Sequence, residues 1–177
     1  MAEDESRFLE AFPGWLKQLG DDARALVALV DNQELPEPTR RRVTGALNYL
    51  FKSLDLIPDG IEDLGYIDDA FVFRVLASEA DAAGDSTGTL TRLAGEAELV
   101  REFLGDDYAR LETYAAGLDH TAARGRSVDE ILGDDAMRAE FVREVKVWAD
   151  GYAAPGFARE PKTQVKLRSF LTAKLPA

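Results

Sequence analysis

The most informative segment of the chain is Ala46-Leu-Asn-Tyr-Leu-Phe-Lys-Ser-Leu-Asp-Leu-Ile-Pro-Asp-Gly-Ile-Glu-Asp-Leu-Gly-Tyr-Ile-Asp-Asp-Ala-Phe-Val-Phe73. It predicts a helix, an acidic corner that contains Pro58, a second acidic turn and another helix. Proline fixes φ and has no amide hydrogen to donate, so one uninterrupted helix across this segment is excluded. The segment therefore predicts a helical hairpin with an acidic, proline-containing corner.

The acids and the glycine of this corner all suit the ends of helices. Aspartate side chains accept hydrogen bonds from the free amides of a helix N-terminus. We expect Asp55 and Asp59 to cap a short helical turn, and Gly65 to reverse the chain after it. Asp68 or Asp69 is expected to cap the second helix of the hairpin.

Apolar residues recur at intervals of three and four on both sides of the corner and along the rest of the chain, which is typical of amphipathic helices. Before the corner they are Val43, Ala46, Leu47, Leu50, Phe51 and Leu54. No run has the alternation or the β-branched content of a strand. The sequence predicts an all-α fold: a single compact multi-helix domain over residues 1–177, built around a central helical hairpin at about 43–83.

The tetrapeptide Leu-Gly-Asp-Asp occurs three times, at 19–22, 104–107 and 132–135. Glycine commonly ends a helix, and an aspartate just after it can cap the next one. We expect each copy to separate two helices, so the first helix should end at Gly20. A capping box is predicted at Ser127 to Glu130.

Composition excludes several classes of function. The net charge of −12 disfavours general nucleic-acid binding, because the surface would repel phosphates. The chain has no cysteine, which excludes thiolate metal sites and cysteine nucleophiles. His120 is the only histidine and is expected in a loop, so a histidine-rich metal site is also excluded.

The corner also resembles a known family. Asp55, Leu56, Ile57, Pro58 and Asp59, followed by Gly65, Tyr66, Ile67, Asp68 and Asp69, look like the signature of the YkvA-like domain of unknown function. The similarity spans about residues 43–77. The resemblance implies a small helical hairpin found in bacterial proteins, many of them membrane-associated, without an established activity. Lys52-Ser53 stand where Ser-Pro is usual in that family.

A second interpretation gives the acids of the corner to a cation. Asp55, Asp59, Asp63, Asp68 and Asp69 supply carboxylate oxygens, which suit Mg²⁺, Mn²⁺ or Ca²⁺. The spacing does not fit an EF-hand loop, since a loop that starts at Asp55 has Ile57 and Tyr66 at two ligand positions. Capping accounts for the same acids without a metal, and we favour it.

Three consecutive basic residues form a possible partner-binding site. Arg40, Arg41 and Arg42 lie in the first turn of a predicted helix, where the helix dipole favours acids instead. They can pair with acids of this chain, which is the common fate of surface arginines, or with an acidic partner.

The last predicted helix, about residues 161–175, is basic and amphipathic, and Pro161 can start it. Such a helix docks on its own domain, lies on an anionic membrane or lies in the groove of a partner, and we favour docking. The start of the chain is acidic where a secretory signal would be basic, and no apolar run is long enough to span a membrane. These features predict a cytoplasmic protein, with any membrane contact peripheral.

No glycine-rich phosphate loop, G-x-S-x-G elbow or dinucleotide motif is present. The sequence therefore favours a non-catalytic interaction or scaffold module that has no cofactor and binds a protein partner. The alternative is a divalent-cation-binding protein or a metal-dependent hydrolase that uses the aspartate cluster.

Overall fold

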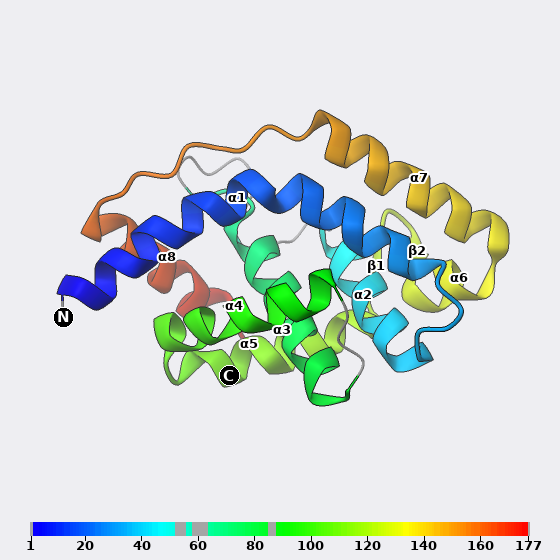
Figure 1. The fold of residues 1–177 in the computed structure, drawn as a ribbon, viewed down its shortest axis with the longest axis horizontal. Helices are drawn as coiled ribbons and strands as arrows, with labels where there is room; N and C mark the ends of the chain where they lie inside the picture. Colours follow the sequence, from blue (N-terminus) through cyan, green and yellow to red (C-terminus); the bar gives the residue numbers. More distant parts are fainter. Residues whose placement is uncertain (1, 52–55, 58–63, 85–87, 177) are drawn as a thin grey trace.

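The computed structural model describes residues 2–51, 56–57, 64–84 and 88–176, with side chains from residue 6 onward. Within them the helices are α1 (Ala2–Val30), α2 (Glu37–Tyr49), α3 (Ile67–Ala82), α4 (Thr89–Leu104), α5 (Asp107–Ala116), α6 (Val128–Gly133), α7 (Asp135–Gly151) and α8 (Pro161–Lys174), with a short 3₁₀ helix at Gly117–His120 (Figure 1). Two strands of two residues each, β1 (Ala122–Ala123) and β2 (Arg126–Ser127), pair antiparallel. The predicted all-α fold class is confirmed.

Helix α1 is the long element against which the others are arranged, and α7 packs along it (Figure 1). It continues through Pro13 and Gly20, so the prediction that the first helix ends at Gly20 is wrong. A Cβ on Gly20 would lie 3.2 Å from the carbonyl oxygen of Ala149 and 3.3 Å from Cδ1 of Tyr152. Gly20 is therefore needed for the close approach of α7 to α1, not for a change of direction.

The other two copies of Leu-Gly-Asp-Asp do separate helices, as predicted. Gly105 has a φ of 58° and follows α4, but Asp106 before α5 makes no side-chain cap. At the third copy Asp134 caps α7, and its Oδ1 accepts a 3.0 Å hydrogen bond from the amide of Met137. The predicted capping box is also confirmed, because Ser127 and Glu130 cap α6 reciprocally.

Helix α3 is the central helix of the core and packs most extensively on α4. Its first turns are buried on every side, including Ile67, Phe71 and Phe73. Helix α2 reaches the core beside it through Val43 and Leu47. The helices that flank the signature are thus the most deeply buried part of the structure.

Helix α8 docks on the domain through its apolar side, with Leu167 and Leu171 fully buried. It begins at Pro161, as predicted. Arg110 of α5 holds its far end by donating hydrogen bonds to the carbonyl oxygens of Thr172 (3.0 Å) and Pro176 (2.9 Å), and also to that of Leu175. An extended connection over residues 152–160 leads from α7 to this helix (Figure 1).

None of the helices in the described part of the chain combines the length and the apolar character needed to cross a membrane.

Candidate functional site

The signature is built around a buried hydrogen bond between Tyr49 and Asp68. The hydroxyl of Tyr49, at the end of α2, donates to Oδ2 of Asp68 at 2.5 Å, and it accepts from the amide of Leu56 at 2.8 Å. The amide of Ile57 also donates to Asp68 Oδ2, at 3.4 Å. Tyr49 and Asp68 are 1% and 0% exposed, so this arrangement lies wholly inside the protein.

The electrostatics of this pair keep the tyrosine protonated. Burial, and then the negative charges of Asp68 and Asp69, raise the pKa of Tyr49 far above its ordinary value. A protonated hydroxyl can donate to Asp68 and still accept from a backbone amide. In this way Tyr49 fastens the corner segment at Leu56 and Ile57 to the start of α3.

The expected capping of α3 by Asp68 or Asp69 is wrong. The N-cap residue is Tyr66, which has a left-handed φ of 68° and makes no side-chain cap. Asp68 and Asp69 instead lie in the first turn, where the helix dipole favours acids. The Tyr66 ring lies 5.9 Å from that of Trp148 and 5.5 Å from that of Tyr152, between centroids, so the turn also packs against α7.

The acids proposed for a cation lie in two places. Asp55, Asp59 and Asp63 fall outside the described residues, as does Pro58. Asp68 and Asp69 are within the described part and are buried. That part contains no group of three histidine, cysteine, aspartate or glutamate side chains able to hold a metal ion.

The three consecutive arginines of α2 make contacts within the chain. Arg40 donates to the carbonyl oxygen of Val30, at 3.2 Å from Nε and 2.8 Å from Nη2. Arg41 pairs with Asp129 at 2.5 Å, and Arg42 with Glu79 at 3.4 Å. They join α2 to three different parts of the fold.

A network of charges that the sequence analysis did not identify joins α1, α3 and α4. Arg74 is fully buried, lies 3.9 Å from the ring centroid of Trp15, and pairs with Glu96 at 3.3 Å. Arg92 pairs with Glu96 at 3.0 Å and also with Asp22, which is 2% exposed. Burial lowers the pKa of Arg74 to about 10 and raises that of Asp22 above its usual 3.8.

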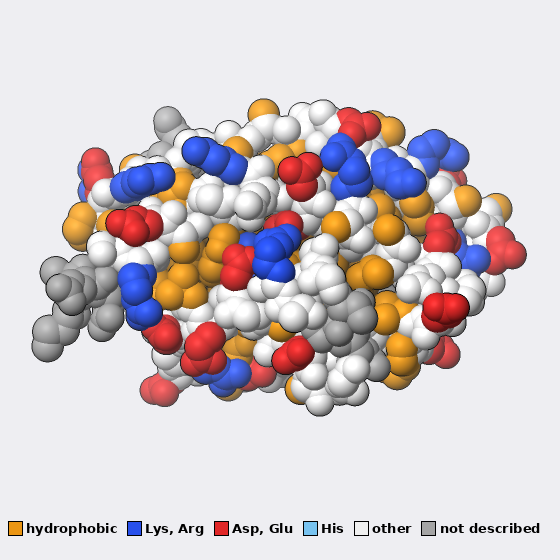
Figure 2. Space-filling model, viewed as in Figure 1, with side chains coloured by type: hydrophobic (Ala, Val, Ile, Leu, Met, Phe, Trp, Pro, Cys, Tyr) orange, Lys and Arg blue, Asp and Glu red, His pale blue; other side chains and the backbone are white. Residues whose placement is uncertain are grey.

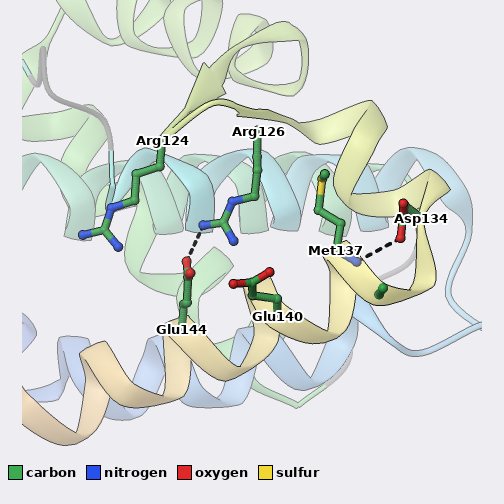
Figure 3. Close-up of a pocket in the computed structure, with 7 residues that line it drawn as sticks. Arg124, Arg126, Asp134, Met137, Glu140 and Glu144 are labelled. Atoms are coloured by element: carbon green, nitrogen blue, oxygen red, sulfur yellow. Dashed lines mark hydrogen bonds and ion pairs between the residues drawn. The ribbon is translucent and has the colours of Figure 1, made fainter.

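Two neighbouring hollows lie between α7 and the β1–β2 hairpin. The first, of about 470 Å³, is lined on one side by Arg124 and Arg126 and on the other by Glu140 and Glu144 (Figure 3). Arg126 Nη2 donates to Glu144 Oε2 at 2.5 Å. The second, of about 310 Å³, shares Arg124 and Glu144 with the first, and its other lining residues are Phe51, Arg143, Val147 and Trp148.

The hairpin turn places its arginines toward these hollows. Arg124 and Gly125 have positive φ values of 51° and 76°, which reverse the chain in two residues. Asn48 of α2 holds the hairpin by donating a 3.1 Å hydrogen bond to the carbonyl oxygen of Arg126. Two-residue strands are too short for a periodic signal, and Arg-Gly is not among the preferred turn pairs. Only Gly125, within a polar segment, could have indicated a turn here.

Charges of both signs are interspersed over the face shown in Figure 2. His120 is largely exposed in its short 3₁₀ helix, and its Nε2 lies 3.3 Å from Asp119 Oδ1.

Comparison with known proteins finds that the signature is similar to a family of unknown function. Residues 39–74 match the family described as "Protein of unknown function (DUF1232)". This match confirms the family type predicted for this part of the chain, and it covers α2, the corner and the first half of α3. Neither the curated proteins nor the solved structures contain a match to the chain. Most of the chain, including α7 and the β1–β2 hairpin, therefore lies outside the matched residues.

Proposed function

We propose that the chain is a YkvA-like helical protein that acts as a non-catalytic interaction module and binds another protein. The observation that carries this proposal is the burial of the Tyr49–Asp68 pair. Tyr49 and Asp68 are directed into the core, where they hold the two helices to Leu56 and Ile57. Exposed arginines, Arg124 and Arg143, are among the residues that line the hollows beside α7.

The net charge of −12 would repel anionic lipids, which supports a place in the cytoplasm with any membrane contact peripheral. The buried acids bear on the cation alternative. One of the two oxygens that Asp68 could offer a cation, Oδ2, already accepts from Tyr49 and Ile57.

Cation titration separates the two functions. The melting temperature of the full chain would be measured with Mg²⁺, Mn²⁺ and Ca²⁺, since a ligand bound only by the folded state raises it. We expect no saturable rise. A rise with one cation that disappears in Asp59→Asn, together with cation-dependent hydrolysis of phosphate esters, would overturn the proposal.

The interaction itself is tested by cross-linking the full chain in a lysate of its source cells and identifying the attached proteins. Each identified protein would then be purified and titrated into the chain by calorimetry. We expect at least one to bind saturably at a fixed ratio. If none does, the chain is not an interaction module.

A further inference from the structure

One hollow is lined by two arginines that have no oxygen partner among the described residues. It is called the α7 hollow, and its lining residues are Phe51, Arg124, Arg143, Glu144, Val147 and Trp148. In the described part of the chain every arginine donates to, or pairs with, an oxygen, except Arg124, Arg143 and Arg159. Two of these three line the α7 hollow.

Arginines without an oxygen partner among the described residues are unexpected in this protein. The chain has 33 acidic residues against 21 basic ones, so each arginine has an excess of carboxylates to choose from. Arg143 is exposed on α7, and Glu144, the only acid among the described residues that line the hollow, already pairs with Arg126. The α7 hollow is therefore a local concentration of positive charge on an acidic molecule.

The wall of the hollow is apolar and partly open. Val147 is 66% exposed, and only Val165 joins it as an exposed large hydrophobic side chain among the described residues. Trp148 is half-buried beside it. The Arg124 guanidinium lies 4.4 Å from the ring centroid of Phe51, which holds this cation at the edge of the apolar wall.

We infer that the α7 hollow binds an acidic, apolar segment of a protein partner, which rests on the interaction role proposed above. A carboxylate of the segment pairs with Arg124 and Arg143, because guanidinium groups match carboxylates in geometry as well as charge. An apolar side chain of the same segment covers Val147 and Trp148.

The surroundings of the hollow argue for a peptide over a more extended anion. Glu140 and Asp134 line the adjoining hollow, and Glu140 has no ion pair within the described residues. A nucleic acid or an anionic membrane would bring further negative charge against these carboxylates and against a surface of net charge −12. A single acidic side chain flanked by apolar ones avoids that repulsion.

The test uses the full chain and three fluorescein-labelled peptides. All three contain leucine, and at one shared set of positions they carry glutamate, glutamine or lysine. Binding is followed by fluorescence anisotropy. We expect the glutamate peptide to bind most tightly. In Arg143→Glu its affinity should fall about tenfold, which corresponds to ~1.4 kcal/mol. Val147→Ser should also weaken it.

The matched control is Arg159→Glu. Arg159 is the third arginine without an oxygen partner among the described residues, and it is exposed and lies outside the hollow. Because both variants replace arginine by glutamate, they change the net charge equally. It should leave the affinity unchanged, and circular dichroism should show all three variants folded as the parent chain. Equal weakening by Arg143→Glu and Arg159→Glu would overturn the site, as would equal binding of the three peptides.

Two further measurements identify other occupants. Saturable binding of inorganic phosphate, or of vesicles that contain phosphatidylserine, that is lost in Arg143→Glu would replace the peptide with a phosphate group and overturn the inference. If the peptides fail but a purified protein still binds the chain with the same affinity in Arg143→Glu, the interaction role stands and only the α7 hollow is wrong.

Discussion

Asp68 of the signature has a use inside the protein, together with Tyr49 at the end of α2. Asp68 accepts from the Tyr49 hydroxyl, which in turn accepts from the amide of Leu56. These residues are separated in sequence by the whole corner, and the hydrogen bonds bring its two ends together. Buried polar groups are costly without partners, so the tyrosine and the aspartate depend on each other.

Tyr49→Phe should therefore destabilise the protein by about 1–3 kcal/mol, since it leaves Asp68 and the Leu56 amide without this partner. Urea unfolding measures the loss. A double-mutant cycle with Asp68→Asn should give a coupling energy that differs from zero. Additive effects would show that the two side chains do not act together.

At the scale of elements, one tetrapeptide behaves in three ways. Leu-Gly-Asp-Asp is internal to α1, ends α4 without a cap, and ends α6 with a cap on α7. Local preference is the same for all three copies, so the difference comes from packing. At the first copy α7 approaches the glycine closely, and the buried Asp22 pairs with Arg92.

Two glycines of α1 test this difference. A Cβ on Gly14 meets nothing within 4 Å, whereas one on Gly20 would press on the Ala149 carbonyl. Gly14→Ala should stabilise the protein by up to about 1 kcal/mol through helix propensity. Gly20→Ala should lower the melting temperature in the same thermal-unfolding assay. A rise for Gly20→Ala would mean that α7 can move away at little cost.

The helices were predictable because apolar spacing reports directly on which faces are buried. The position of the corner in the sequence was predictable. The role of its aspartates was not, because the same residue type serves as a helix cap and as the acceptor of a buried hydrogen bond. The α7 hollow could not be predicted from the sequence. Arg124 and Arg143 come from a hairpin turn and a helix, and whether an arginine finds an oxygen partner depends on every neighbouring element.

At the scale of the whole molecule, several arginines of this acidic chain join one helix to another through ion pairs or hydrogen bonds. Arg74 and Arg92 join α1, α3 and α4 through Asp22 and Glu96, and Arg110 holds α8. Asp22 is the member of this network whose pKa burial raises above its usual 3.8, against the opposing effect of Arg92.

This shift predicts a pH dependence with a definite sign. Between the raised pKa of folded Asp22 and its usual 3.8, the folded state binds a proton that the unfolded state does not. The stability of the parent chain should then rise relative to that of Asp22→Asn as the pH falls through this window. Urea unfolding of both proteins across the window gives the difference, in which the other acids cancel. A fall in the stability of the parent chain relative to Asp22→Asn would mean that Arg92 and Arg74 outweigh burial.

At the turn that carries Arg124, the residue type that favours folding differs from the one that favours binding. Its positive φ of 51° disfavours arginine, and asparagine or glycine would form the same turn at lower cost. Variants selected for heat resistance alone should drift to those residues, while variants selected for partner capture should retain the guanidinium. Replacing Arg124 would therefore raise the stability of the protein and remove a side chain that the proposed partner's carboxylate needs.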